Sequence, residues 1–392
     1  MNTLIDEAYK LEPEIIKWRR WIHQHAEVEM ELPKTSGYVE SILDEIKIPH
    51  DRWAGSGVVG TIGQGERVIL LRADMDALPQ SELSDLPYAS KTVAMHACGH
   101  DMHTAMLLGA AKLLKKKEGH LCGKVVLMFQ PGEECMLGAK AMIDEGLLSE
   151  YKPECAFAMH VNVGNVPAGE IWIKQSTFMA ASDNLKVVVK GKNGHGAHPH
   201  NAVNPIYAAI RIIDAFTDIS RYETSPMIPN ILTVCNVESG KAANVIPDCC
   251  TFRGTLRTLD KGVRQRILKR LEDAAKSIAL AYGCKAEITI IASVPCTTND
   301  ARVSSWAEER LVQLLGKEHV SSPIMPSMGS EDFAYISQLI PSCYMSIGTG
   351  RKENGRYPLH NMNIIFDEGQ MYLGAAAFAA LAIDYFDGNR VL

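Results

Sequence analysis

The 392-residue sequence lacks a strong excess of charge of either sign, and this excludes several classes of protein. Forty-six acidic residues against 40 basic ones give a net charge of −6, so there is no basic footprint for nucleic acid. The longest apolar run, 372–383, is also too short to span a bilayer. We therefore expect no nucleic-acid partner and no membrane partner.

Cysteine is scarce, and the first residues do not have the pattern of a secretory signal. Ten cysteines in 392 residues fall far below the density of a disulfide-rich domain. Residues 1–10 contain no basic stretch followed by an apolar one. We expect a cytoplasmic protein whose cysteines are reduced and mostly buried as small apolar side chains.

The first half of the chain alternates short apolar runs with amphipathic helical patterns. The apolar runs cover 68–71, 124–129 and 156–159, and the helical patterns include 3–25, 101–117 and 138–147. This alternation predicts an α/β domain with a largely parallel sheet. In such sheets ligands bind at the carboxyl ends of the strands, and each of these runs ends in polar residues.

From about residue 184 the pattern changes to strand, helix, two strands, helix and strand. The corresponding segments are 185–189, 204–215, 231–237, 251–256, 263–281 and 288–291. This order predicts an α+β domain with one sheet and two helices on one face. We therefore predict a catalytic domain in two parts, 1–183 and 295–392, with a smaller domain, 184–294, inserted between them.

The segment Met95-His-Ala-Cys-Gly-His-Asp-Met-His103 places three histidines, a cysteine and a carboxylate close together. Thiolate, imidazole and carboxylate groups suit a divalent transition metal better than they suit a packed core. On a helix, Cys98 and His100 would point about 200° apart, so both reach one metal only from a loop, which Gly99 allows. A buried free cysteine beside a helix-capping histidine is the alternative.

Glu133 and Glu134 follow a Pro-Gly pair in a strand-to-helix loop. Adjacent side chains diverge, so one carboxylate can bind a metal while its neighbour moves protons. An acidic first helical turn is the alternative. Taken singly, His160 is explained as well by a core histidine as by a metal ligand, and His360 as well by a surface-loop histidine as by a metal ligand. Taken together, these residues predict a metal-dependent hydrolase.

The sequence resembles the amidohydrolase branch of the aminoacylase metallopeptidases, which includes hippurate hydrolases, N-acetyl-amino-acid deacetylases and plant indole-acetyl-amino-acid hydrolases. The resemblance covers nearly the whole chain. It implies a dinuclear-metal, aminopeptidase-like α/β catalytic domain with an inserted ferredoxin-like α+β domain for dimerisation and lid function. The motifs that carry it are Met95 to His103, Pro131-Gly-Glu-Glu, Ala158-Met-His160, Gly194-His-Gly-Ala-His-Pro, Gly329-Ser-Glu-Asp-Phe and Pro358-Leu-His360-Asn.

The resemblance implies two divalent metal ions per subunit, with manganese or zinc expected first and cobalt or nickel as alternatives. It implies five protein ligands and a bridging role for Cys98. Our hypothesis is that one ion takes two histidines and the other takes a glutamate and a histidine. The expected ligands are Cys98, His100 and His160 for one ion, and Cys98, Glu134 and His360 for the other.

The resemblance also gives roles to four further residues. Glu133 is the expected general base and, later, the acid that protonates the departing amine. His195 matches a family histidine that reaches into a neighbouring subunit's site. Asn244 and Arg257 match residues that hold the substrate's α-carboxylate, for which an arginine fork is well shaped. Without the resemblance, His195 and Asn244 would be turn residues and Arg257 a surface charge.

Several residues near these motifs stay open between two roles. Asp74 and Asp76 either orient a ligand histidine from behind or simply end a strand. We expect His96 and His103 to be structural. Asp101 is a substitute ligand that ranks below Cys98.

The function implied is hydrolysis of N-acyl L-amino acids to a carboxylate and a free amino acid, by a homodimer or higher homo-oligomer. A dipeptidase or carboxypeptidase of the same family is the closest alternative. Two other classes are a thiol enzyme, in which His96 or His100 activates Cys98, and a catalytically inactive metal-stabilised binding protein. The acyl group, the amino acid and the native metal do not follow from the sequence.

Overall fold

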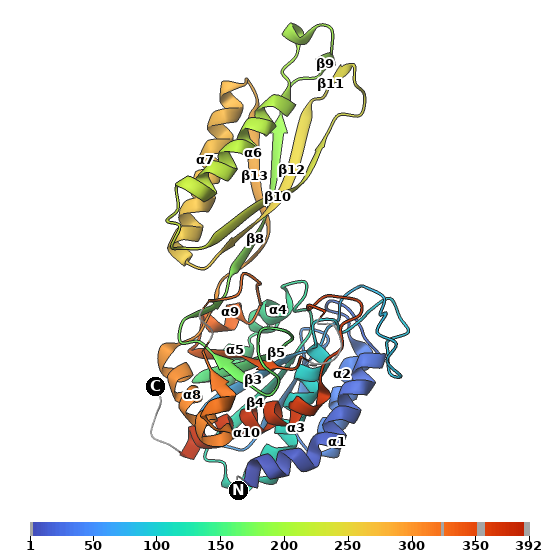
Figure 1. Ribbon diagram of the computed structural model, residues 1–392, viewed down its shortest axis with the longest axis vertical. Helices are drawn as coiled ribbons and strands as arrows, with labels where there is room; N and C mark the ends of the chain where they lie inside the picture. The colour runs from blue at the N-terminus through green and yellow to red at the C-terminus, as the bar shows by residue number, and fades with distance from the viewer. Residues whose placement is uncertain (1–2, 323–324, 351–356, 388–392) are drawn as a thin grey trace. The chain divides into compact units, whose positions relative to one another are not determined.

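The computed structural model describes residues 3–322, 325–350 and 357–387, and the chain divides into two compact units (Figure 1). Unit 1 comprises Met1–Ser176, Thr298–Met325 and Asp332–Leu392. Unit 2 comprises Thr177–Thr297 and Pro326–Glu331. The chain therefore leaves unit 1 after Ser176 and returns to it at Thr298, so that unit 2 interrupts unit 1 in the sequence.

An eight-stranded sheet forms the centre of unit 1, in the order β1-β2-β4-β3-β5-β16-β6-β15. Its four middle strands are parallel and nearly all buried, as expected of apolar strands covered on both faces. These strands are β4 (Lys124–Gln130), β3 (Val68–Asp74), β5 (Cys155–Asn162) and β16 (Ser342–Gly348). The outer strands are β1 (His50–Trp53), β2 (Gly57–Ile62), β6 (Ile171–Ile173) and β15 (Val320–Ser321); the pairs β1-β2, β2-β4 and β6-β16 are antiparallel, and β15 is parallel to β6.

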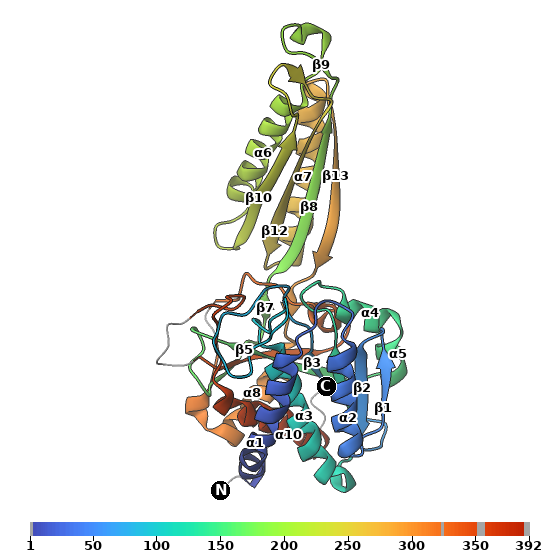
Figure 2. The ribbon, with the colours of Figure 1, turned by 90° about the vertical axis from the view of Figure 1, so that its right-hand side faces the viewer.

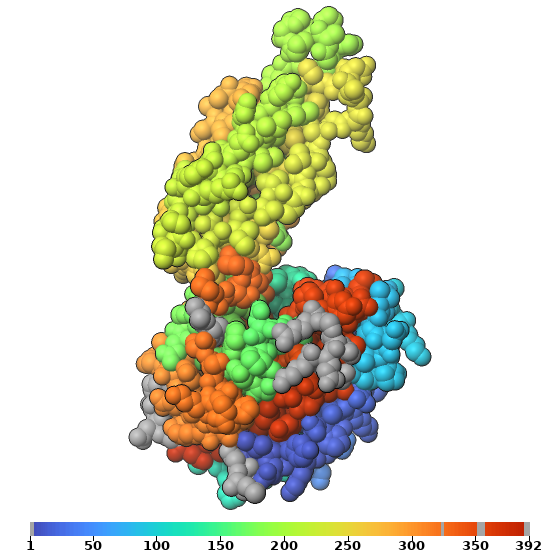
Figure 3. All heavy atoms as spheres, in the orientation of Figure 1, coloured from blue at the N-terminus to red at the C-terminus, as the bar shows by residue number. Residues whose placement is uncertain are grey.

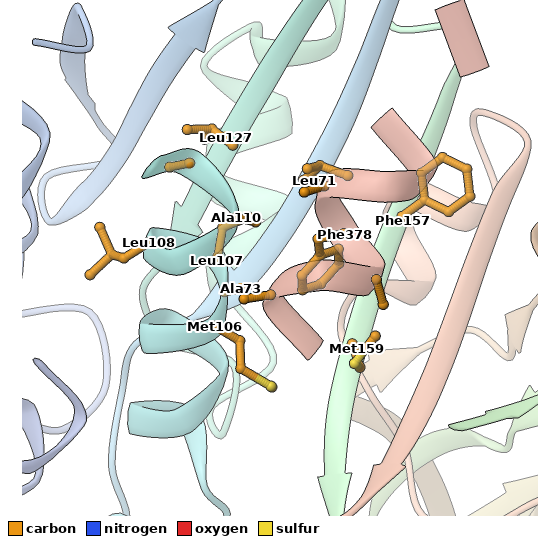
Figure 4. Packing of buried hydrophobic residues seen from close by; sticks show 14 of the residues in the cluster. Leu71, Ala73, Met106, Leu107, Leu108, Ala110, Leu127, Phe157, Met159 and Phe378 are labelled. Atoms are coloured by element: carbon orange, nitrogen blue, oxygen red, sulfur yellow. The ribbon is translucent and has the colours of Figure 1, made fainter. Parts of the chain in front are cut away.

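Helices α3 and α10 pack against this sheet and against each other. Figure 4 shows side chains of α3, such as Leu107, beside strand residues such as Leu71 and beside Phe378 of α10. The Ala-rich run 372–383 belongs to α10, where a Cβ on Gly374 would lie 2.2 Å from the Met106 sulfur. Small residues therefore allow these two helices to approach closely. None of the described helices has the length and apolar character needed to span a membrane.

Helices α1 and α3 match the helical patterns predicted over 3–25 and 101–117, and the pattern over 138–147 is divided between α4 and α5. Their bounds are α1 (Thr3–Gln24), α2 (Pro33–Glu45), α3 (His100–Lys116), α4 (Gly138–Asp144), α5 (Leu147–Tyr151), α8 (Ala301–Leu315), α9 (Ala334–Ser337) and α10 (Met371–Asp387). The short 3-10 helices are η1 (Glu118–His120), η2 (Pro199–Asn201), η3 (Lys317–His319) and η4 (Glu368–Gln370), of which η2 belongs to unit 2.

Unit 2 has the predicted ferredoxin-like arrangement. Its strands are antiparallel in the order β10-β12-β8-β13, and its chain order is strand, helix, two strands, helix, strand (Figure 2). Both helices bury their apolar faces in one core with the sheet. The elements are β8 (Ala181–Lys190), α6 (Pro205–Tyr222), β10 (Asn230–Ser239), β12 (Cys249–Thr258), α7 (Lys261–Ala281) and β13 (Lys285–Val294).

Four shorter strands complete the set. In unit 2, β9 (Gly194–His195) pairs with β11 (Val245–Ile246) and forms a small antiparallel ribbon. The other two strands, β7 (Thr177–Met179) and β14 (Thr297–Thr298), pair with each other. The ribbon carries His195, which is one of the predicted site residues.

Candidate metal centre

The predicted metal ligands of unit 1 follow the carboxyl ends of neighbouring parallel strands. β4, β3 and β5 are adjacent in the sheet, so the segments that leave their carboxyl ends meet at one edge. Glu133 and Glu134 come just after β4, His160 lies near the end of β5, and His100 is the first residue of α3. The sheet therefore brings together residues that are far apart in the sequence.

Cys98 lies at the end of a loop, and His100 is the first residue of α3, with Gly99 between them. The sequence predicted that a loop at Gly99 would let both side chains reach one site. Gly99 has φ +88°, and a Cβ there would lie 2.3 Å from a methyl group of Val161. Only glycine fits this position without a shift of its neighbours. The turn places the Cys98 sulfur 3.4 Å from Nε2 of His160.

The five expected ligand side chains form two groups that share Cys98. In each group the potential ligand atoms all lie within 4.8 Å of one another. One group is Cys98, His100 and His160, and the other is Cys98, Glu134 and His360. The groups have the same membership as the two ligand sets in the sequence hypothesis. Glu133 also lies within this distance of His100 and Glu134.

Two ligand atoms are buried without a hydrogen-bond partner of ordinary geometry among the described residues. They are Nε2 of His100 and Oε1 of Glu134. Nδ1 of His100 lies 2.9 Å from the main-chain oxygen of Asp76, to which it donates, so in the neutral ring Nε2 carries the lone pair that can bind a metal. Buried polar atoms are rarely left unpaired, and a divalent cation would satisfy both. The mixed sulfur, nitrogen and oxygen donors therefore fit a transition-metal site.

Asp76 holds the glutamate pair in place. Its two carboxylate oxygens accept hydrogen bonds from the backbone N–H groups of Glu133, at 2.9 Å, and Glu134, at 3.0 Å. Its main-chain oxygen orients His100. Asp76 thus contacts Nδ1 of His100 through its main-chain oxygen and, at 3.4 Å, through its carboxylate, which also positions the next loop.

Asp74 and His103 form a separate structural pair. Nδ1 of His103 donates to the Asp74 carboxylate at 2.5 Å, and Nε2 accepts the N–H of Val161 at 2.8 Å. Both ring nitrogens of His103 are therefore engaged in hydrogen bonds. Asp74, His100 and His103 also have potential ligand atoms within 4.8 Å of one another. Arg72 pairs with the other Asp74 oxygen at 2.8 Å.

A buried polar network that the sequence did not predict supports Glu133. Glu133 is only 5% exposed, and one of its oxygens accepts the N–H of Asp332 at 3.4 Å. The Asp332 carboxylate is held in turn by Arg72 at 3.0 Å and by the amide of Gln130 at 2.8 Å. The only sequence signal was the place of Asp332 in the Gly-Ser-Glu-Asp-Phe motif.

Burial moves the pKa of two ligand candidates in opposite directions. It raises the pKa of the Cys98 thiol well above its ordinary value, although nearby His100 opposes the change. Burial, helped by the charge of His103, lowers the pKa of His160 well below its ordinary value. The His160 ring is thus neutral at pH 7. A protonated thiol is a poor nucleophile, which weakens the thiol-enzyme alternative.

The two remaining candidates lie behind the cluster. His96 is 1% exposed, and burial lowers its pKa to about 3. The Asp101 carboxylate lies 2.6 Å from Nε of Arg19 and 2.8 Å from Nδ1 of His23. Among the described residues, it belongs to none of the candidate metal-binding groups. The lower rank given to Asp101 agrees with this geometry.

His195 and Asn244 lie side by side in unit 2. His195 pairs with Val245 across the β9-β11 ribbon, and the main-chain oxygen of Asn244 accepts the N–H of Gly196 at 2.8 Å. Nδ1 of His195 accepts the N–H of Ala197 at 3.0 Å. In a neutral ring the proton is therefore on Nε2, which becomes a hydrogen-bond donor.

Arg257 lies at the other end of unit 2. It is in β12, eight residues after Cys249, which corresponds to about 27 Å of extended strand. Asn244 lies beyond the Cys249 end of this strand, beside β11. Arg257 donates to the hydroxyl of Ser330 at 2.7 Å, and burial lowers its pKa. Unit 2 of one chain thus keeps Arg257 far from Asn244.

Comparison with known proteins adds a family to this geometry. A model of peptidase family M20/M25/M40 matches residues 70–384. Thermostable carboxypeptidase 2 of Saccharolobus solfataricus is 34% identical, over 98% of both chains. N-acetylcysteine deacetylase of Bacillus subtilis is 35% identical, over 94% of this chain and 96% of the relative.

A solved structure agrees with these matches. It is a Bacillus subtilis protein described as a dinuclear metal-binding peptidase of the M20 family, with a TM-score of 0.84 and 32% identity. The match covers 96% of this chain and 99% of that one. The resemblance therefore extends over both units, including the strand ends that carry the candidate ligands.

Proposed function

This chain belongs to peptidase family M20/M25/M40, and from that premise we propose that it hydrolyses the amide bond of N-acyl L-amino acids. The products are a carboxylate, such as acetate or benzoate, and the free amino acid. The observation that carries the proposal is the pair of ligand groups that share Cys98, with the Glu133 carboxylate beside them. The deacetylase relative supports the choice of substrate class.

The proposed cofactors are two divalent cations per subunit, manganese or zinc before cobalt or nickel. Cys98, His100 and His160 would hold one cation, and Cys98, Glu134 and His360 would hold the other. Two observations support this division. The potential ligand atoms of each group lie within 4.8 Å of one another, and Nε2 of His100 and Oε1 of Glu134 are buried without a hydrogen-bond partner of ordinary geometry in the described part of the chain. When bound, such cations polarise the amide carbonyl and lower the pKa of a coordinated water to about 7.

Glu133 is the proposed carrier of the proton. Its carboxylate takes a proton from the attacking water and delivers it to the nitrogen of the departing amine. A positioned acid-base group of this kind contributes roughly 10²–10⁴-fold to the rate. The hydrogen bond from the N–H of Asp332 orients the Glu133 side chain for this role.

Unit 2 supplies the proposed substrate contacts. His195, with its proton on Nε2, donates to the oxyanion of the tetrahedral intermediate, and Asn244 and Arg257 bind the α-carboxylate. Asn244 and Arg257 are separated by most of the length of β12 within one chain, so a single substrate meets both only if two chains contribute. This separation supports a homodimer in which His195 and Asn244 act in the partner's site. A cytoplasmic location stays a prediction.

Two alternatives have different standing. Cleavage of dipeptides or carboxyl-terminal residues uses the same site, and the carboxypeptidase relative favours it as the second candidate. A catalytically inactive binding protein has less support. A structural site needs no spare carboxylate such as Glu133 next to its ligands.

A substrate panel tests the proposal. The purified protein is assayed with N-acetyl and N-benzoyl amino acids and with dipeptides, before and after removal of metal by a chelator. We expect hydrolysis of N-acyl amino acids that stops on chelation and returns when manganese or zinc is added. The matched variant Glu133→Gln should bind the same number of cations and lose activity by roughly 10²-fold or more. Full activity in the chelated protein would contradict the proposal.

A further inference from the structure

The segment 75–99, which connects β3 to α3, forms hydrogen bonds with the loop that carries His360. The N–H of His360 donates to the main-chain oxygen of Ala97 at 2.9 Å, and the amide of Gln80 donates to the His360 oxygen at 3.2 Å. The N–H of Leu83 donates to the oxygen of Met362 at 2.8 Å. The two segments meet at the surface of unit 1, where Figure 3 shows them in light blue and red.

His360 depends on these contacts more than the other histidine ligands do. Its φ of +68° lies in the left-handed region that side chains other than glycine rarely adopt. Its side chain is 52% exposed, whereas that of His100 is fully buried. Because little packing surrounds the His360 ring, the main-chain hydrogen bonds must fix its position and keep this uncommon conformation.

Buried charges fix the Gln80 segment in turn. The Glu82 side chain is fully buried and accepts hydrogen bonds from the N–H of Ser90, at 2.7 Å, and from Nε2 of His23, at 3.0 Å. Nδ1 of His23 faces the Asp101 carboxylate at 2.8 Å. Each ring nitrogen of His23 thus faces a carboxylate, which is the arrangement of a doubly protonated, cationic ring.

This network connects α1 to both candidate ligand groups. Asp101, next to His100, is bonded to His23 of α1, and His23 is bonded to Glu82. The loop that contains Glu82 reaches the His360 segment through its neighbours Gln80 and Leu83. The first group is also held by the start of α3 and the end of β5, whereas the backbone of His360 relies on the Gln80 segment. Disturbing Glu82 or Gln80 should therefore affect the second group more than the first.

We propose that Gln80 and the His23–Glu82 ion pair are positioning residues that set the affinity of the Cys98, Glu134 and His360 group for its cation. They do so through the backbone of His360 and touch neither the cation nor the substrate. This inference rests on the proposed function, since it assumes that this group binds one of two cations. It adds residues outside the motifs to the determinants of metal loading.

Stepwise metal binding tests the proposal without relying on activity. Metal-free wild type, Gln80→Ala and Glu82→Gln are titrated with zinc by calorimetry, and bound zinc is counted by elemental analysis. Gln175→Ala is the matched control, because its amide contacts the surface residue Glu308. We expect two binding steps in wild type. Gln80→Ala should weaken one step by about threefold to tenfold and change the other step by less than about twofold.

Glu82→Gln is included because Gln80 is partly exposed, so that Gln80→Ala alone could have only a small effect. Glu82→Gln keeps the shape of the side chain and removes its charge, so it should weaken the same step by more than about tenfold. If it does not fold, Gln80→Ala alone decides. Equal binding by Gln80→Ala and Gln175→Ala, or equal weakening of both steps, would overturn the positioning role and leave the two-cation site intact. A wild type that binds one cation would overturn the site and the inference together.

Discussion

Cys98 is the residue on which both candidate ligand groups depend. Its thiol is buried, and burial raises its pKa well above the ordinary value. The metal-binding form is the thiolate, so a cation that binds here must displace a proton. His100 adds to this requirement because its pKa is also raised, since Asp74 and Cys98 outweigh the opposing effect of burial.

We predict that metal binding releases at least one proton per subunit near neutral pH. Because protons and cations compete for Cys98 and His100, the affinity for metal should rise as the pH rises and fall as it falls. Calorimetric titration at about pH 7 in two buffers of different ionisation enthalpy measures the protons released. Heats that do not depend on the buffer would rule out a thiol ligand that is protonated before binding.

At the scale of residues, the sequence pointed to the candidate ligands but not to the residues that position them by hydrogen bonds. Cys98, Glu134 and the three histidines have the right donor atoms and stand in motifs, so their types and order could be interpreted. The roles of Asp76 and Asp332 could not be predicted, because both depend on backbone N–H groups. The Asp76 carboxylate accepts the N–H of Glu133, and the N–H of Asp332 donates to the Glu133 carboxylate. Every residue except proline has such a group, and a pattern of side chains does not reveal which one is used.

The elements place these residues through one tight turn at the start of α3. Gly99 precedes the helix with φ +88° and lies against Val161 of β5. An added Cβ would strain the backbone and also collide with the strand that carries His160. The beginning of α3 and the end of β5 must therefore keep this separation for Cys98 to reach His160.

We predict that Gly99→Ala destabilises the fold and weakens metal binding. A left-handed conformation costs roughly 1–2 kcal/mol for alanine, and overpacking costs roughly 1–3 kcal/mol more. Urea unfolding of the metal-free protein measures the loss of stability. Gly37→Ala is the control, because Gly37 lies in α2 with open space around it and should gain about 0.5–1 kcal/mol. An unchanged stability for Gly99→Ala would refute this account of the turn.

The sequence predicted long elements better than short ones. The helical pattern over 138–147 is two helices, α4 and α5, because the chain turns at Gly146 with φ +110°. The helix predicted at 204–215 continues to Tyr222. Strands β1 and β2 and the β9-β11 ribbon were not predicted, since runs of two to six residues carry little periodic signal. The ribbon forms because β9 pairs with β11, which lies far from it in the sequence.

At the scale of the whole molecule, the proposed substrate site needs more than one chain. His195 and Asn244 lie at the ribbon end of unit 2, and Arg257 lies at the other end of β12. The change of strand and helix pattern in the sequence predicted an inserted domain over 184–294, whereas unit 2 of the structure comprises Thr177–Thr297 and Pro326–Glu331.

We predict that two inactive variants restore activity when their subunits mix. Glu133→Gln keeps His195, and His195→Ala keeps Glu133. A mixed dimer therefore has one complete site if His195 acts in the partner's site. Random exchange makes half of the dimers mixed, each with one of two sites intact, so activity should approach about a quarter of wild type. Mixing followed by an amidase assay measures this. No recovery after proven exchange would exclude donation between subunits.

The central claim is that five side chains gather two cations about one shared sulfur. The most direct measurement is a crystal structure of the zinc-loaded protein with anomalous diffraction at the zinc edge. We predict two zinc peaks per subunit, both bonded to Cys98, one also to His100 and His160 and the other also to Glu134 and His360. Zinc peaks elsewhere, or a Cys98 sulfur bonded to no cation, would contradict the account.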